Sequence, residues 1–370
     1  MNHFPTVDQI PLPAPVWLLK ALHDLTFSLH LTAVDLLLGG LMISLVLALL
    51  GRLRHSVEMT QTSGMLIHRL PIVMAFVINL GIPPLLFAQV LYGRALYTSS
   101  ILIGAYWIAV IVLLIGSYWS LYISASLSDR RRSWFGPGLA ALLLALTIAF
   151  IYSNNMTLML RPQLWNAMYR NSPAGLQLNT SDPALMPRWL FFISGSFPAA
   201  GAALLLMSLR SGLSDSLISF MTRTGGVSIA AAIVVQSVFA LMTMSAQPNN
   251  VVPTVMADPL YSAFAYSWLT TAVLLAVLGV VAVFAKGASA LIGIAAAAVA
   301  FLNVFSAVMV RDGIRDVTLR MAGFDVWDRH VASNWSVIDL FLFLLVTALV
   351  VVVWLATVAG KARRTEERYV

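Results

Sequence analysis

The first long apolar stretch of the chain contains the ionisable side chains best placed to do chemistry. His30 and Asp35 lie inside this stretch, and His23 and Asp24 lie just before it. Ionisable groups inside an apolar segment long enough to cross a membrane are costly, so each is a candidate for function. On a helix, His23 and His30 share a face about 10 Å apart, and Asp35 lies about 140° around the axis from His30. The two histidines therefore cannot bind one metal ion without partners from other helices, and His30 does not pair directly with Asp35.

Three interpretations of His30 are open. Its neutral imidazole could ligate a haem iron while a second group holds the other ring nitrogen. It could bind or deprotonate a quinol, or it could simply hydrogen-bond to a neighbouring helix. Asp35 faces either a polar bundle interior or a proton path. We take His30 as the candidate metal ligand, and His23, His30 and Asp35 as the candidate cofactor-binding residues.

Composition indicates the surroundings of these residues. The chain has 370 residues, of which 60% are hydrophobic and 10% charged, and its mean hydropathy is +0.88. Soluble domains carry roughly 25% charged residues, so lipid must be the solvent for most of this chain. The sequence contains no cysteine, which excludes disulfides, iron–sulfur ligation, thiolate zinc sites and C-x-x-C-H haem attachment within it. The net charge of +7 is explained by membrane topology rather than by nucleic-acid binding.

The apolar segments predict an all-α, polytopic transmembrane helix bundle. A span needs about 20 mostly apolar residues. Nine stretches qualify, at 27–51, 69–93, 98–125, 136–154, 187–209, 225–246, 262–285, 287–310 and 336–359. The mixed stretch 13–25 predicts a short amphipathic helix at the membrane surface, within an interfacial N-terminal segment 1–26. In the second span, Pro83 and Pro84 donate no backbone hydrogen bond, which predicts a kink or an unwound turn there.

Basic residues predict the orientation of the spans. The segments on one side of the predicted membrane hold 13 of the 22 Lys and Arg residues. Because cytoplasmic loops are enriched in Lys and Arg, this side is the cytoplasmic one. We therefore predict a multi-pass protein of a bacterial inner membrane, with a periplasmic N-terminus and a cytoplasmic C-terminus.

Two longer loops are predicted on the periplasmic side. Loop 155–186 contains Trp165, several prolines and several asparagines, which predicts an ordered cap. Loop 311–335 carries four acidic and four basic residues, beginning with Arg311, Asp312, Arg315 and Asp316. Their spacing allows pairing along a helix. We interpret this segment either as a solvated surface helix or as a docking surface for a soluble partner.

A weak internal repeat relates the first and fifth spans. His30 precedes Gly39-Gly40 at nearly the spacing at which Phe191-Phe192 precedes Gly201. Small residues at these positions would let helices approach closely. The predicted parts are a first four-helix unit (27–154), a periplasmic loop (155–186) and a second four-helix unit (187–310). A second periplasmic loop (311–335) and a ninth helix with a cytoplasmic tail (336–370) follow.

Four segments of the chain carry a resemblance to a known family. They are Ser28-Leu-His30 with the run to Gly40, Ile78-Asn79-Leu-Gly81 through Gln89 to Gly93, Leu96-Tyr97 with the span to Tyr122, and Val310-Arg311 through Asp316 to Trp335 and the final span. Together they resemble subunit I of the cytochrome bd quinol oxidases, within a wider group of divergent bd-like membrane subunits. The resemblance covers about half of the chain and implies the same nine-span, N-out and C-in plan.

The resemblance implies that His30 is a haem ligand, but the chain also departs from the family's pattern at several positions. His30 falls where the family places a haem-ligating histidine on its first helix. The family's second such histidine, on its fifth helix, is matched here by Phe191 or Phe192. The second and third spans contain no glutamate, where the family has acidic residues at its oxygen-reducing haem, and loop 247–261, matching the quinol-binding loop, is short and lacks basic residues. These departures argue against oxygen reduction.

These observations lead to three hypotheses about function. The first is a respiratory electron-transfer subunit, with one b-type haem or a quinol, that links membrane quinol to a periplasmic cytochrome-type partner. The second is a cofactor-free anchor for other redox subunits. The third is a transporter or channel, supported only by Asp35 and by the predicted break at Pro83-Pro84. In the first two cases the chain is part of an oxidoreductase complex rather than an enzyme by itself.

Overall fold

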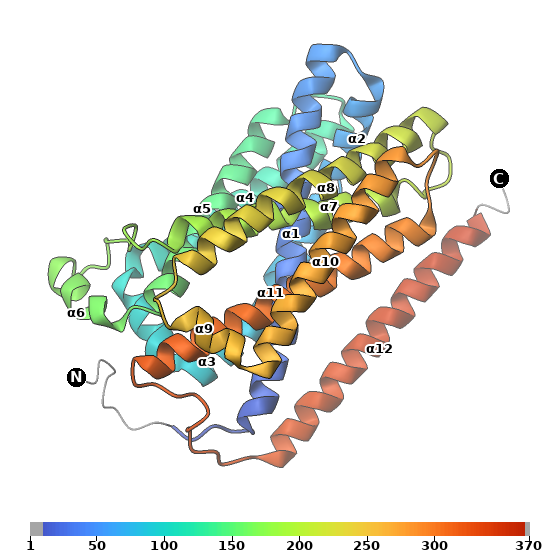
Figure 1. The fold of residues 1–370 in the computed structure, drawn as a ribbon. Helices are drawn as coiled ribbons and strands as arrows, with labels where there is room; N and C mark the ends of the chain where they lie inside the picture. Colours follow the sequence, from blue (N-terminus) through green and yellow to red (C-terminus); the bar gives the residue numbers. More distant parts are fainter. Residues whose placement is uncertain (1–9, 367–370) are drawn as a thin grey trace. The chain divides into compact units, whose positions relative to one another are not determined.

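The structure is a computed structural model that describes residues 10–366, and it is almost entirely helical (Figure 1). Its helices are α1 (Val16–Arg54), α2 (Val57–Ile67), α3 (Leu70–Leu102), α4 (Gly104–Asp129), α5 (Phe135–Leu158), α6 (Pro162–Asn171), α7 (Leu185–Met207), α8 (Asp215–Ser245), α9 (Val251–Ala257), α10 (Pro259–Phe284), α11 (Ala290–Met321) and α12 (Trp335–Glu366). Within residues 10–366 the only β-pairing is one isolated bridge. The predicted all-α helix bundle is confirmed.

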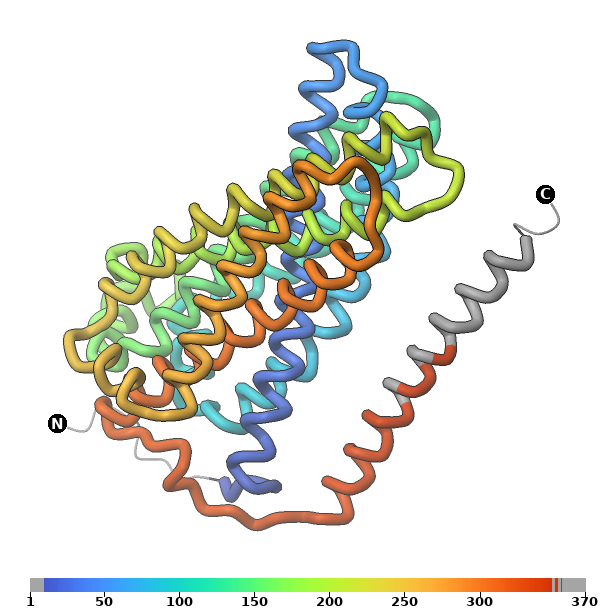
Figure 2. Tube along the Cα trace, turned by 45° about the vertical axis from the view of Figure 1, so that its right-hand side comes forward, coloured from blue at the N-terminus to red at the C-terminus, as the bar shows by residue number. Residues whose placement is uncertain are grey.

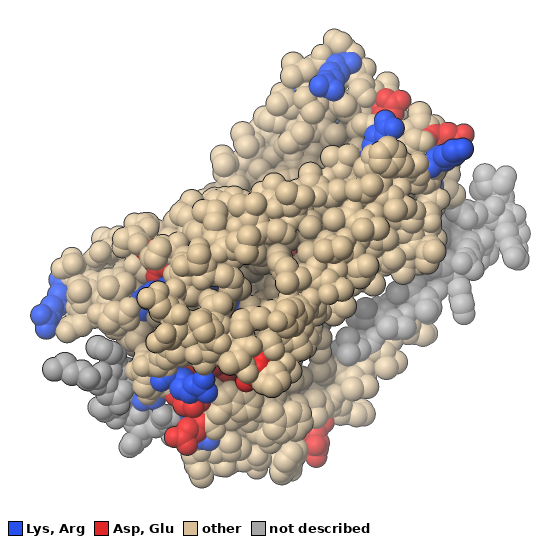
Figure 3. Space-filling model, in the orientation of Figure 1, with Lys and Arg blue, Asp and Glu red and all other residues tan. Residues whose placement is uncertain are grey.

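Eight segments of the described chain are long and apolar enough to cross a membrane. They coincide with the first eight predicted spans, and α12 coincides with the ninth, with an apolar part at Trp335–Thr347. On the face drawn in Figure 3, charged side chains gather toward the ends of the long helices, and uncharged ones cover the middle. This is the distribution that a lipid bilayer requires.

The described residues divide into two compact units. The larger unit, Lys20–Val326, holds nearly all the helices. In the smaller unit, residues 10–19 pair with residues 327–334: the Leu12 amide donates to His330 O at 2.8 Å, and the Ala332 amide donates to Leu12 O at 2.9 Å. Helix α12 follows this pairing within the smaller unit.

The core of the larger unit includes one small buried cluster that joins α9, α10 and α11, and three others. One joins α1, α3, α4 and α5, the second joins α7, α8, α10 and α11, and the third joins α1 and α2 to α7 and α8. Figures 1 and 2 both show α7, α8, α10 and α11 running side by side. Helices α1 and α7 approach closely at Gly39, where an added Cβ would lie 2.8 Å from Ala200 Cβ. The close approach predicted at these small residues is confirmed, whereas the internal repeat stays a prediction.

The predicted break at Pro83-Pro84 does not occur there. Helix α3 continues through both prolines, and its one non-helical residue is Tyr92, with φ −122° and ψ 22°. A proline removes a backbone donor but keeps helical φ, so the backbone can stay helical through both prolines, and the kink of α3 lies at Tyr92 instead. This correction removes one of the two observations that supported a transporter.

The prediction of a separate interfacial helix at 13–25 is also wrong. Helix α1 starts at Val16 and runs without interruption to Arg54, so most of the predicted stretch is the first part of the first span. Lys20, His23 and Asp24 are buried at 6%, 2% and 2% exposure. Residues 1–9 of the predicted segment 1–26, and residues 367–370 of the predicted cytoplasmic tail, lie outside the described residues.

Of the two predictions about the longer loops, one is confirmed and the other is wrong. Loop 155–186 is ordered, as predicted: it contains α6, the Trp165 indole donates to Leu158 O at 2.9 Å, and Arg161 pairs with Asp182 at 2.9 Å. The surface helix predicted at the start of 311–335 is wrong. Helix α11 continues to Met321 and buries Asp312, Arg315 and Asp316. These three charges, which were part of the predicted docking surface, are therefore internal, whereas Arg320 and Asp328 are exposed.

Candidate functional site

The larger unit contains a cavity of about 400 Å³ that we call the His30 cavity. Its walls come from α1, α3, α4, α5, α7 and α11, and most of its lining side chains are apolar. The three residues predicted from the sequence as cofactor-binding, His23, His30 and Asp35, all line it. The structure therefore brings the predicted site residues to one cavity, although they cannot converge on one atom.

His30 is held in a defined orientation by helix α3. Its Nδ1 lies 3.0 Å from Val77 O. A carbonyl oxygen can only accept, so Nδ1 carries the proton and Nε2 keeps a lone pair. Gly81 makes room for the ring, because a Cβ at this position would lie 2.9 Å from His30 Cε1. The predicted hydrogen bond to a neighbouring helix is thus observed, and it leaves Nε2 in the form that ligates a metal.

Asp35 and His23 differ in their contacts. Asp35 is 6% exposed and has no hydrogen bond or ion pair to any described residue. It is therefore a lone carboxyl group on the wall of an apolar cavity. In contrast, His23 Nδ1 lies 2.8 Å from Asp24 Oδ1, and the His23 ring stacks on Phe27 with centroids 5.9 Å apart. His23 is thus already partnered.

A buried network of charges lies next to the cavity and joins α1, α3, α10 and α11. Lys20 Nζ lies 2.5 Å from carboxylate oxygens of both Asp312 and Asp316. The Tyr92 hydroxyl donates to Asp316 at 2.7 Å, and the Tyr261 hydroxyl donates to Asp316 at 3.3 Å. Buried charges are stable only when they are paired and hydrogen-bonded, and this network meets both conditions.

One corner of this network has the geometry of a cation site. His23, Asp24 and Asp312 place potential ligand atoms within 4.8 Å of one another. However, Asp312 already pairs with Lys20 and with Arg315. The protein's own cations therefore neutralise this carboxylate, which argues against a metal ion among these three residues.

Three arginines, Arg188 from α7 and Arg311 and Arg315 from α11, line the His30 cavity and also a second cavity. Their guanidinium groups lie over aromatic rings: Arg311 is 4.5 Å from the centroid of Phe27, and Arg315 is 3.9 Å from that of Tyr92. Several of their N–H groups are buried without a hydrogen-bond partner among the described residues: Arg188 Nε, Arg311 Nε, Arg311 Nη1 and Arg315 Nε. Arginine N–H groups favour carboxylate and phosphate partners.

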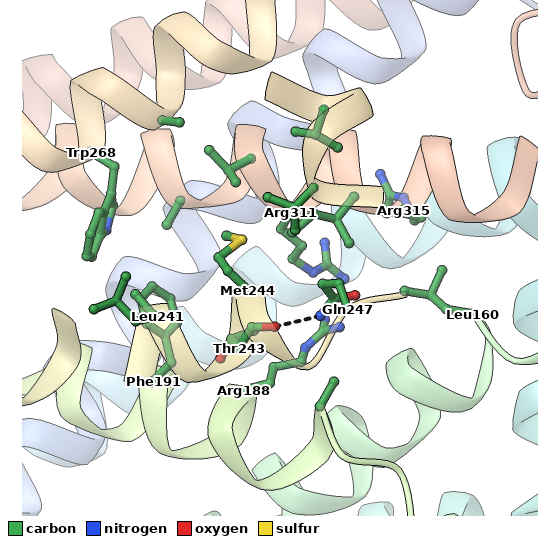
Figure 4. A pocket seen from close by; sticks show the side chains of 18 of the residues that line it. Leu160, Arg188, Phe191, Leu241, Thr243, Met244, Gln247, Trp268, Arg311 and Arg315 are labelled. Carbon is green, nitrogen blue, oxygen red and sulfur yellow. Dashed lines mark hydrogen bonds between the residues drawn. The ribbon is translucent and has the colours of Figure 1, made fainter. Parts of the chain in front are cut away.

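The second cavity, which we call the Trp268 cavity, has a volume of about 350 Å³. Its walls come from α5, α7, α8, α9, α10 and α11. In Figure 4, Arg188 and Arg311 extend toward each other from α7 and α11. Gln247 Nε2 donates to Thr243 O at 2.9 Å on one side of the cavity. Phe192 lines both cavities, and Phe191 lines the Trp268 cavity.

Sequence reasoning missed the arginines and the buried network. Arg311, Asp312, Arg315 and Asp316 follow an apolar span directly, and no proline intervenes between Ala290 and Met321. A helix that continues from a span without a breaker, and whose charges balance, could have suggested internal pairing. Lys20, Tyr92 and Tyr261 carried no such signal, because their partners lie far away in the sequence.

Comparison of the chain with protein-family models, and with curated proteins, finds no match. The case for any function therefore depends on the residues and their geometry.

Proposed function

We propose that this chain is an integral membrane subunit of an electron-transfer complex, in which His30 binds the iron of a b-type haem. The orientation of the His30 ring is the observation that carries this proposal. Its Nδ1–H donates to Val77 O, which leaves the Nε2 lone pair for a partner at the cavity wall. Histidines bound to metal almost always donate their other ring N–H in this way.

The other residues of the His30 cavity suit a haem. Apolar side chains form most of its walls, and Met74, Met156 and Met159 offer thioethers, a ligand type that haem iron accepts. Arg315 offers an N–H group to carboxylates. A bound haem would supply one-electron transfer, and the Val77 carbonyl would fix the tautomer of its histidine ligand.

The proposed partners and location follow from the topology predicted by the basic residues. The chain would lie in a bacterial inner membrane with its N-terminus periplasmic, and it would link membrane quinol to a periplasmic cytochrome-type partner. Its main competitor is a cofactor-free anchor for redox subunits. A transporter has less support, because α3 stays helical through Pro83 and Pro84, which removes one of the two observations behind that hypothesis.

A redox difference spectrum tests the proposal. The chain is purified in mild detergent with its partners, and the dithionite-reduced-minus-oxidised absorption spectrum is recorded. We expect b-type haem bands that His30→Ala abolishes while the helical circular dichroism is kept. His68→Ala is the matched control, because the His68 side chain is 59% exposed and contacts only Asp129, at 3.0 Å. If the isolated chain gives a flat spectrum and any haem belongs to a partner, the haem proposal is wrong and the anchor replaces it.

A further inference from the structure

The Trp268 cavity contains buried N–H groups that require a partner. Arg188 Nε and Arg311 Nε and Nη1 are buried without a hydrogen bond to any described residue. A buried donor left unpaired costs about 1–3 kcal/mol, and more when it is charged, so native proteins rarely keep one. Carboxylate and phosphate groups match the planar donors of arginine best.

The charges around this cavity also favour an anion. The buried cations next to it are Lys20, Arg188, Arg311 and Arg315, and the buried carboxylates are Asp24, Asp312 and Asp316. These four cations outnumber the three carboxylates even when each of the three is ionised. Asp35 lines the His30 cavity but not the Trp268 cavity, and it makes no ion pair with any of the four cations. Arg161, which also lines the cavity, is separately balanced by Asp182 at 2.9 Å. An uncompensated charge in an apolar interior is strongly unfavourable.

The cavity reaches the lipid-facing side of the bundle. Leu241, Met256 and Leu269 line it, and their side chains are 72%, 38% and 54% exposed on α8, α9 and α10. Most of the other lining side chains are apolar, and Met244 and Met256 adapt easily to chains of different shape. A ligand with an apolar tail could therefore enter from the bilayer.

We propose that the Trp268 cavity binds an anionic amphiphile from the bilayer, with a phosphate or carboxylate head group on Arg188 and Arg311. Its acyl chain lies along the apolar wall that includes Leu241 and Leu269. Basic pockets between transmembrane helices are suited to anionic lipid head groups. A neutral quinol would fill the apolar part but would not compensate the guanidinium charges. The inference does not depend on the haem proposal, although the same arginines line both cavities.

Lipid retention and rebinding test this inference. The wild-type protein is exchanged into lipid-free detergent, and the lipids that remain are identified by native mass spectrometry and by extraction. We expect a retained anionic lipid, and the head group found by mass distinguishes a phosphate from a carboxylate. After complete delipidation, added dioleoylphosphatidylglycerol or oleate should bind, and dioleoylphosphatidylcholine should not. Binding that is equal for anionic and zwitterionic lipid, or retention of a quinone alone, overturns the inference.

Variants separate this site from the haem site. Arg188→Gln and Arg311→Gln should lower retention of the anionic lipid about tenfold or more, since each removes a charge-assisted hydrogen bond. Arg210→Gln, an exposed arginine just beyond the other end of α7, should leave retention unchanged. Ala307→Phe, which fills only the Trp268 cavity, should lower retention without changing any charge. His30→Ala should keep the lipid whether or not a haem is bound, so the two proposals fail independently.

Discussion

The buried charged network and the His30 cavity lie next to each other, but they differ in whether their polar groups have partners. In the network, Lys20, Tyr92 and Tyr261 supply donors to Asp312 and Asp316. In the cavity, His30 keeps one ring nitrogen unused and Asp35 has no partner among the described residues. The network is far richer in charge, yet both of its carboxylates, Asp312 and Asp316, are paired with a cation.

This difference shows that charge density by itself does not indicate a functional site in a membrane bundle. A satisfied network holds helices together, because each charge would be very costly without its partner. A polar group that faces a cavity without a partner requires either an explanation or a ligand. We therefore assign a structural role to the network, Arg315 included, and a functional role to the His30 cavity and to Arg188 and Arg311. The predictions below test this division.

The largest effect is expected from Lys20→Met. The substitution leaves Asp312 and Asp316 buried without the ammonium group that contacts both, so the free energy of unfolding should fall by about 3–5 kcal/mol. Titration with sodium dodecyl sulfate in mixed micelles measures it. Lys286→Met, an exposed control, should change stability little. If Lys20→Met is as stable as this control, the network does not hold α1 to α11.

Gly81→Ala should have the next largest effect. The new methyl group would lie 2.9 Å from His30 Cε1, so the ring must shift and its bond to Val77 O is disturbed. Overpacking of this kind costs about 1–3 kcal/mol. Gly93→Ala, on the same helix, meets only ordinary contacts at 3.5 Å and should be neutral or slightly stabilising. If the haem band is lost in Gly81→Ala and kept in Gly93→Ala, haem binding depends on the orientation of the His30 ring. If the two variants have equal spectra, it does not.

The effects expected from the two tyrosines are no larger than that of Gly81→Ala, and they should differ from each other. Tyr92→Phe removes a 2.7 Å hydrogen bond to Asp316 inside the network and should cost about 1–3 kcal/mol. Tyr261→Phe removes bonds of 3.3 and 3.5 Å and should cost less. The same titration measures both variants. If Tyr261→Phe lowers the free energy of unfolding more than Tyr92→Phe does, the hydrogen bonds from α10 stabilise the network more than those from α3.

Much of the fold could be predicted from the sequence, because lipid imposes a simple rule. Every span must be a long apolar helix, so length and hydropathy locate the spans. The errors arose where tertiary packing overrode a rule that considers only the local sequence. Pro83 and Pro84 suggested a break, but helical φ is compatible with proline and α3 stays helical through them. Residues 13–25 looked interfacial because Lys20, His23 and Asp24 are polar, yet α1 buries all three.

The candidate site was predicted less completely. His23, His30 and Asp35 stood out as ionisable groups in or next to a span, and they do line one cavity. The sequence did not indicate that His30 would bond to Val77, because this contact joins positions 47 residues apart. The role of Arg188 and Arg311 was hidden for the same reason: only the packing of α7 against α11 brings them to a shared cavity wall.

The most direct test of the central claim is chemical rescue of His30→Gly. This variant should lack the reduced-minus-oxidised haem bands of the wild-type protein, because it lacks the ligand and leaves the imidazole space empty. Added imidazole should enter that space and restore the bands, and the same imidazole should leave the wild-type spectrum unchanged. If His30→Gly shows wild-type haem bands without imidazole, His30 is not the haem ligand, and the account of this cavity is wrong.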